Sequence, residues 1–202
     1  MKIALYTPEL TIQEAKRFWM TAEQICDLSA IGDSRDPKIK KLLNTLSDRG
    51  HVPFVKSGTA KTSPRLYSLV SAAMLRVIYE ITRDGRTYNY AQPVADMVRD
   101  QMIAAIGNNA DIGALEQDIG VARIMFSGID ATGGAARVKW SDGEIAGGLG
   151  LAFSVLDAGY MIWRIIDLYP DWWWKDLVAR GVVQPDDPVQ IGVDGWPVEG
   201  GT

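Results

Sequence analysis

Three lysines and an asparagine between residues 38 and 44 carry the clearest chemistry in this sequence: Lys38, Lys40, Lys41 and Asn44. Ammonium groups bind phosphate oxygens, and Lys and Asn side chains also donate hydrogen bonds to base edges in the major groove of DNA. Apolar residues recur through the same segment at helical spacing, namely Ile39, Leu42, Leu43 and Leu46. The segment therefore predicts a helix with a buried apolar face and an outer face suited to duplex DNA.

The charge around this segment favours an anionic partner. Between residues 35 and 65 the chain carries eight basic residues, Arg35, Lys38, Lys40, Lys41, Arg49, Lys56, Lys61 and Arg65. Only Asp36 and Asp48 oppose them, in a protein of 202 residues whose formal net charge is −4. Such a basic island in an acidic chain indicates nucleic-acid binding.

The elements that would position these donors can be predicted from local signals. Thr21 and Gln24 form a capping box for a first helix. Asp36 and Pro37 are the N-cap and first residue of the second helix, and Gly50 ends it. Alternating apolar residues from Val52 and a glycine-containing loop then predict a two-stranded hairpin, which brings Lys56, Lys61 and Arg65 near DNA phosphates.

The order of two helices, a basic hairpin and Arg65-Leu66-Tyr67 before another helix resembles the MerR-type winged helix-turn-helix DNA-binding domain, over roughly residues 19–98. In that family an Arg-Leu-Tyr signature closes the wing. The family's recognition helix usually carries Ile-Arg-Tyr-Tyr where this chain has Ile39-Lys40-Lys41-Leu42. The resemblance implies a homodimer that binds duplex DNA and alters promoter geometry.

Other interpretations of the same residues remain open. The two helices are also consistent with an ordinary helical hairpin whose charged face is solvated. Tyr67 either donates its hydroxyl to a phosphate or packs in the core beneath the hairpin. The DNA-binding residues predicted from the sequence are Arg35, Lys38, Lys40, Lys41, Asn44, Lys56, Lys61, Arg65 and Tyr67.

The predicted fold class is α+β, with an N-terminal winged helix-turn-helix followed by a small α+β domain. A third helix is predicted over residues 68–82, and a fourth, reaching residue 106, with Pro93 in its first turn. Short strands are predicted near residues 122–126, 136–140 and 152–156. A helix over residues 160–168 is expected to break at Pro170, before a last helix over residues 171–180.

These elements divide the chain into four predicted parts. They are an N-terminal extension at residues 1–18, the DNA-binding domain at 19–106, an α+β effector or dimerisation domain at 107–183, and a flexible tail at 184–202. Residues 1–106 carry a net positive charge and residues 107–202 a net negative charge. This charge asymmetry indicates that the second half has a different function from the first.

Aromatic residues gather in the second half. Its candidate ligand or interface residues are Trp140, Tyr160, Trp163, Trp172, Trp173 and Trp174. Such side chains could wall a pocket for an apolar or cationic effector, but tryptophan is equally enriched at subunit interfaces. We favour the interface.

Other chemistry has little support in the sequence. One cysteine, Cys26, and one histidine, His51, do not supply a catalytic triad, a disulfide or a metal-sensing thiolate cluster. The glycine-rich segments match no nucleotide-binding fingerprint. No cofactor and no enzymatic activity are expected. We expect a cytoplasmic, nucleoid-associated bacterial protein that does not enter membranes.

The sequence thus predicts a homodimeric transcriptional regulator that binds double-stranded DNA, with RNA polymerase or another protein as a further partner. Two alternatives use the tryptophan-rich half: a protein–protein adaptor, and a small-molecule sensor.

Overall fold

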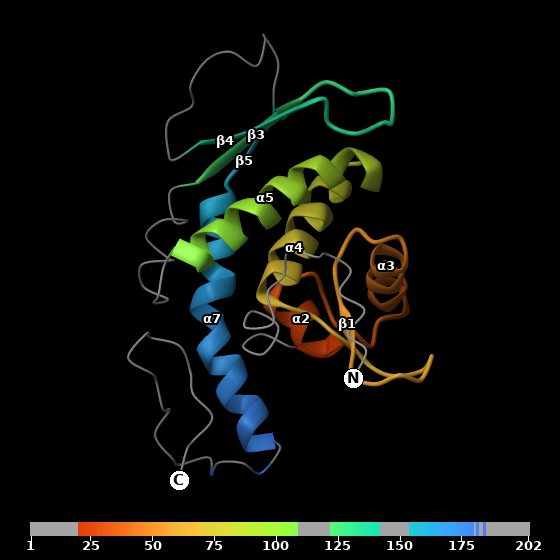
Figure 1. Cartoon of the computed structure of the whole chain (residues 1–202), viewed down its shortest axis with the longest axis vertical. Helices are drawn as coiled ribbons and strands as arrows, with labels where there is room; N and C mark the ends of the chain where they lie inside the picture. Colours follow the sequence, from red (N-terminus) through yellow and green to blue (C-terminus); the bar gives the residue numbers. More distant parts are fainter. Residues whose placement is uncertain (1–19, 109–121, 142–153, 180, 182–183, 185–202) are drawn as a thin grey trace.

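The computed structural model describes residues 20–108, 122–141, 154–179, 181 and 184, with backbone alone at 105–108, 166 and 168–177. These residues form an α+β fold, as predicted (Figure 1). Its elements are α2 (Ala22–Leu28), α3 (Pro37–Asp48), β1 (Val55–Lys56), β2 (Arg65–Leu66), α4 (Leu69–Arg83), α5 (Tyr88–Asn108), β3 (Arg123–Ser127), β4 (Arg137–Ser141), β5 (Ser154–Leu156) and α7 (Ala158–Ala179). The predicted extension at 1–18 and the predicted tail after Gln184 lie outside the described residues.

The helix starts follow the local signals in the sequence. The Thr21 hydroxyl accepts from the Gln24 N–H and the Gln24 side chain accepts from the Thr21 N–H, so the predicted capping box of α2 is confirmed. Asp36 caps α3, with Pro37 as its first residue. Gly50 follows α3 with a φ of 78°, a left-handed conformation that glycine adopts without strain.

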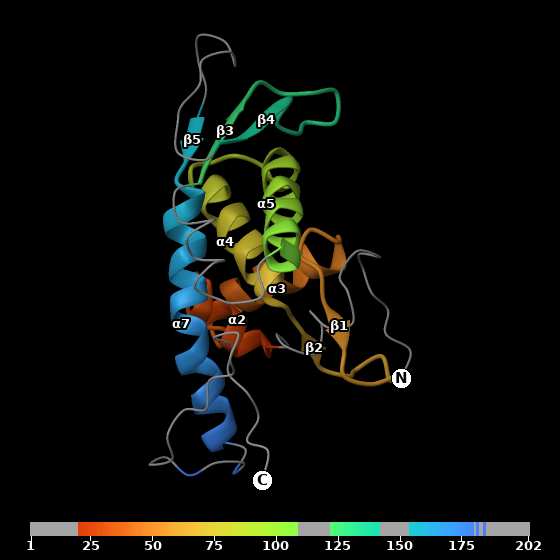
Figure 2. The same ribbon diagram turned by 60° about the vertical axis from the view of Figure 1, so that its left-hand side comes forward.

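The fold has two small antiparallel sheets that lie apart, one at the top and one at the lower right of Figure 2. In one, β1 pairs with β2, and Val55 lies opposite Leu66. In the other, β3 lies between β4 and β5, at the positions where the sequence predicts three strands. Met20, just before α2, forms an antiparallel bridge with Tyr67, and this ties the start of α2 to the end of the β1–β2 hairpin.

The predicted start of the fourth helix is wrong. Thr87 caps α5 through a 3.1 Å bond from the Tyr90 N–H, so Pro93 lies inside the helix. Proline has no N–H to donate to the Asn89 carbonyl. The β3–β4 loop packs beside this point: a Cβ added at Gly134 would lie 3.1 Å from Pro93 Cγ, and the Ala135 N–H donates to the Tyr90 carbonyl.

The predicted break at Pro170 is also wrong, because α7 is one helix from Ala158 to Ala179. A proline removes a single intrahelical hydrogen bond, and the bonds on either side of it remain. The long helix lies along α2 and α4 in both views (Figures 1 and 2). Among the described residues, no helix is long and apolar enough to span a membrane.

One hydrophobic core connects the two halves of the sequence. It extends from Ile25 on α2, through Leu46 on α3 and most of α4, to Ile124 on β3 and to Ile162 and Ile165 on α7. The helix α4 lies at its centre and packs against α5, α7 and α2. The position of α2 therefore depends on packing against α4 as well as on its own cap, and Leu46 joins α3 to the same core.

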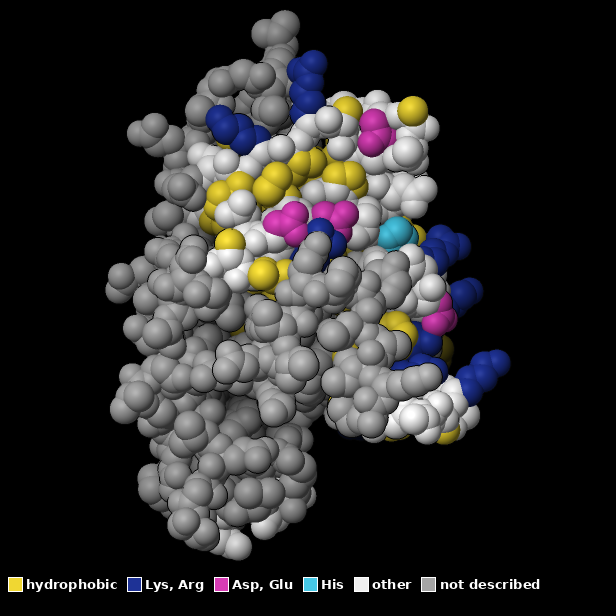
Figure 3. All heavy atoms as spheres, viewed as in Figure 1, with side chains coloured by type: hydrophobic (Ala, Val, Ile, Leu, Met, Phe, Trp, Pro, Cys, Tyr) yellow, Lys and Arg dark blue, Asp and Glu magenta, His cyan; other side chains and the backbone are white. Residues whose placement is uncertain are grey.

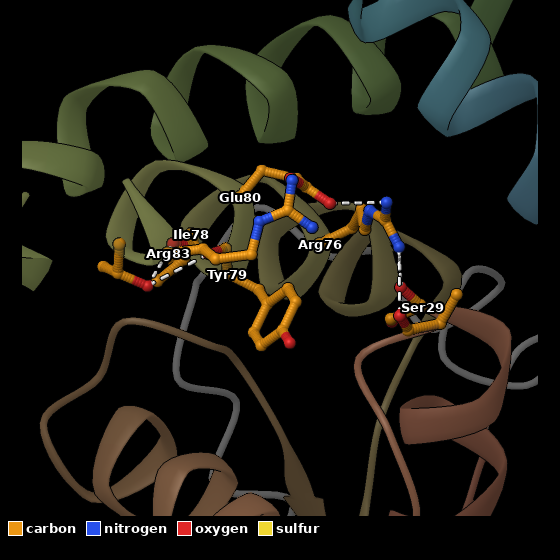
Figure 4. A network of polar contacts seen from close by, with 8 residues as sticks. Ser29, Arg76, Ile78, Tyr79, Glu80 and Arg83 are labelled. Atoms are coloured by element: carbon orange, nitrogen blue, oxygen red, sulfur yellow. Dashed lines mark hydrogen bonds and ion pairs between the residues drawn. The ribbon is translucent and has the colours of Figure 1, made fainter. Parts of the chain in front are cut away.

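Arg76 joins the end of α2 to α4 (Figure 4). Its Nη1 donates to the carbonyls of Ser29 and Ala30 at 3.0 and 3.1 Å, which are among the acceptors left free where α2 ends. Its Nη2 pairs with Glu80, which also pairs with Arg83. Ala30 has a left-handed φ of 51°, and Arg76 therefore holds a turn that alanine seldom adopts.

We predict that Arg76→Met lowers the free energy of unfolding by about 2 kcal/mol, because two carbonyls lose hydrogen bonds from a charged donor. Arg83→Met is the matched control. Its side chain is 61% exposed, and among the described residues its one ion pair is the outer contact with Glu80, so a loss below about 1 kcal/mol is expected. Urea unfolding measures both, and equal losses would contradict the role given to Arg76.

Candidate nucleic-acid interface

A groove of about 1080 Å³ lies between α2, α3 and the β1–β2 hairpin. It contains five of the residues predicted to bind DNA at exposed or half-buried positions: Arg35, Lys40, Asn44, Lys61 and Arg65. In the space-filling view, Lys and Arg side chains project along the edge formed by α3 and the hairpin, with an acidic side chain among them (Figure 3). The fold therefore collects donors that are up to 30 residues apart in sequence.

The lysines of α3 do not all point the same way. Successive helical residues are rotated by about 100°, so Lys38 and Lys40 project from opposite edges of the exposed face. Lys41 and Asn44 lie near its centre, and all four side chains are exposed. The exposed face of α3 is therefore wide, with Lys38 and Lys40 at its two edges and Lys41 and Asn44 between them.

Arg35, in the turn before α3, already has an anionic partner. Its guanidinium lies 3.0 Å from Glu23 on α2 and 4.0 Å from Asp33. The hydrogen bond and charge of Glu23 raise the pKa of Arg35 above its ordinary value. Both side chains of the pair are well exposed, at 78% and 59%, so the contact holds Arg35 only weakly.

The hairpin presents two basic residues directly opposite each other. Lys56 on β1 pairs in register with Arg65 on β2, so both side chains lie on one face of the hairpin. Lys56 Nζ donates to the carbonyl of Lys61 at 3.1 Å, and the Lys61 side chain is exposed in the loop. Arg65 lies against α3, where it pairs with Asp48.

Tyr67 is a core residue, and its predicted contact with DNA is wrong. It is 1% exposed, and its hydroxyl lies 3.1 Å from Ser47 Oγ on α3. Burial raises the pKa of Tyr67, although the Ser47 hydrogen bond and Arg65 act in the opposite direction. A buried hydroxyl that already has a partner cannot reach a phosphate.

The interface also contains acidic side chains that the sequence analysis did not assign to it. Glu23 and Asp48 line the groove beside the basic residues. Asp48 could have been found by helical spacing, because it lies four residues after Asn44 and seven after Lys41 on the same face of α3. Its pairing with Arg65 crosses the hairpin, and no local pattern indicates it.

The single cysteine lies behind this surface. Cys26 is fully buried on α2, and burial raises the pKa of its thiol to about 11, with Asp27 and Asp33 adding to the shift. His51 is half-buried, and its Nδ1 is hydrogen-bonded to Gln92 Oε1 on α5. Within the described part of the chain, no three His, Cys, Asp or Glu side chains cluster as metal ligands would.

The aromatic candidates of the second half are divided between two environments. Trp140, on β4, is partly buried and packs against the core. Tyr160 and Trp163 face outward from α7 and are 57% and 39% exposed. The side chains of Trp172, Trp173 and Trp174 lie outside the described residues. The described aromatics therefore favour an exposed patch on α7 over the wall of a pocket.

No protein-family model and no curated protein matches this chain.

We predict that Tyr67→Phe lowers the free energy of unfolding by about 1 kcal/mol, because it removes the buried hydrogen bond to Ser47. At temperatures where the variant is folded, its affinity for duplex DNA should equal that of the wild type. Thermal unfolding and fluorescence anisotropy test the two statements. Ser47→Ala serves as the partner variant in a double-mutant cycle. A loss of DNA affinity in Tyr67→Phe that is absent from Ser47→Ala would instead support a contact between Tyr67 and a phosphate.

Proposed function

We propose that this protein is a homodimeric DNA-binding regulator of MerR-like type, and not an enzyme, that reads a roughly palindromic duplex site through α3. One observation carries the proposal: Lys40 and Asn44 on α3 line one groove together with Lys61 and Arg65 of the basic hairpin. Lys41 is exposed on the same helix, next to this groove-lining edge. A helix flanked by a basic hairpin suits a major groove and its bordering phosphates. Within this proposal, α2 and α3 form the helix-turn-helix and β1–β2 is its wing.

The lysines of α3 are available for such contacts. Lys38, Lys40 and Lys41 make no ion pair with any described residue, in contrast to Arg35 and Arg65. A lysine that pairs with no carboxylate keeps its full charge for a phosphate, so binding should release counterions and weaken steeply with salt. RNA polymerase, or another protein of the transcription machinery, is a proposed further partner.

We propose that the outer face of α7 supplies the homodimer contact. Ala158, Ile162 and Ile165 are buried on one side of this helix. Tyr160 and Trp163 project from the opposite side, together with Arg164 and Asp167, which are also exposed. An exposed aromatic pair bordered by one charge of each sign is self-complementary across a two-fold axis. The same patch would serve the adaptor alternative, in which it binds a different protein.

For DNA binding, the predicted result is salt-sensitive affinity for a random-sequence duplex and tighter affinity for the protein's own promoter. Lys41→Ala should reduce affinity mainly for the promoter. Lys61→Ala should weaken all sequences about equally and reduce the salt slope by about one. Fluorescence anisotropy at several salt concentrations measures each effect.

Lys139→Ala is the matched control for these variants, because it removes the same charge from an exposed position on β4. It should leave both affinities nearly unchanged. Absence of binding by the wild type even at low salt would contradict the DNA-binding proposal and favour the adaptor. Equal losses from Lys41→Ala and Lys61→Ala on every duplex would remove the base contacts assigned to α3.

For the homodimer, we predict that Trp163→Glu lowers the dimer fraction at a given concentration, since a buried carboxylate would oppose association. Sedimentation equilibrium measures the effect. Ile129→Glu is the control, because Ile129 is 66% exposed in the β3–β4 loop, away from α7. A dimer that tolerates Trp163→Glu as well as Ile129→Glu would place the contact elsewhere.

A further inference from the structure

The guanidinium of Arg65 is held in place from three directions. It lies over the ring of Phe54, 4.7 Å from the ring centroid. Its Nη1 lies 3.5 Å from the carbonyl oxygen of Asn44 on α3, and its Nη2 lies 2.5 Å from Asp48 Oδ1. The side chain is only 25% exposed. Arg65 is thus a fixed planar donor group that has an anionic oxygen bound to it.

The Asp48 carboxylate is a weakly held partner of Arg65. The Asp48 side chain is 64% exposed at the last turn of α3, and Arg65 is the one residue with which it forms an ion pair in the described part of the chain. An ion pair in which one partner is mostly solvated contributes little to stability. A phosphate oxygen presents the same geometry to a guanidinium as a carboxylate oxygen does.

The position of this pair matters because both partners border the groove between α3 and the hairpin. Asp48 is on the same face of α3 as Lys41 and Asn44. Arg65 is directly opposite Lys56 in the hairpin, so two positive charges are adjacent there. Like charges in opposite positions destabilise each other, and an anion between them and α3 would relieve this repulsion. A DNA backbone that follows α3 would meet this site.

We infer that Arg65 forms a phosphodiester-binding site at which Asp48 stands in for the phosphate in the free protein. On binding, a backbone phosphate replaces the Asp48 carboxylate on the guanidinium, while Phe54 and Asn44 keep Arg65 in position. This inference rests on the proposed function and adds to it an internal competitor for DNA. Asp48 then limits affinity for any duplex, so that base contacts from α3 are needed for tight binding.

The test is a double-mutant cycle of Asp48→Asn and Arg65→Met, measured by anisotropy on a random-sequence duplex at low salt. Asp48→Asn keeps the shape of the side chain but frees Arg65, so affinity should rise about five-fold, the effect of one charge contact in water. In the Arg65→Met background the same change should give less than half of that gain. Arg65→Met keeps an apolar stem beside Phe54, and circular dichroism checks that each variant is folded.

Asp84→Asn is the matched control. Asp84 is exposed at the end of α4, and its substitution changes the net charge by the same amount as Asp48→Asn. It should alter affinity less than two-fold, by the weak action of distant exposed charges. A gain for Asp48→Asn no larger than that for Asp84→Asn would overturn the inference. Equal gains with and without Arg65 would also overturn it, because they would show general repulsion and no competition for the guanidinium.

The two proposals fail in different ways. If the wild type and Asp48→Asn both fail to bind DNA at low salt, the proposed function fails and the phosphate site fails with it. If the wild type binds DNA with the expected salt dependence and Asp48→Asn gains nothing, the regulator proposal stands and only the competition between Asp48 and phosphate is lost.

Discussion

The burial of Tyr67 is the constraint on which the geometry of the candidate interface depends. Its backbone exchanges hydrogen bonds of 2.7 and 2.8 Å with Met20, before α2, and its hydroxyl is bonded to Ser47 on α3. Its ring lies beside Phe54 at the base of the hairpin. Tyr67 thus joins the three elements that line the groove, through its backbone at the start of α2 and through its side chain at α3 and the hairpin. Because Tyr67 follows directly after Arg65-Leu66, the same short segment also delivers the guanidinium to α3.

Much of this fold could be predicted from local sequence because its signals are local. Thr21, Asp36 and Ser68 each cap a helix through a residue two or three positions away, and periodicity identified the strands and the buried faces. The predictions that relied on proline were wrong: Pro93 lies inside α5, and α7 continues through Pro170. A proline removes one N–H, and whether a helix ends there depends on neighbouring segments such as the β3–β4 loop, which packs beside Pro93.

The candidate site was predictable in composition but not in detail. The sequence identified the basic residues, and the helical period alone places Lys38 and Lys40 on opposite edges of the exposed face of α3. The partners of these residues are not local: Asp48 and Arg65 are 17 positions apart, and Ser47 and Tyr67 are 20 apart. Whether a polar side chain is solvated, paired or buried depends on such contacts. Such contacts bury Tyr67 in the core, whereas Lys41 has none with any described residue and stays exposed on the surface.

Two arginines with nearly equal exposure show how the partner determines the role. Arg76 and Arg65 are 24% and 25% exposed, and each forms a 2.5 Å ion pair. Glu80, the partner of Arg76, is 13% exposed, so both members of this pair are largely shielded from water. Asp48 is 64% exposed, so water readily solvates it once it leaves Arg65. Glu80 therefore holds Arg76 where it donates to the carbonyls at the end of α2, whereas the partner of Arg65 is mostly in water.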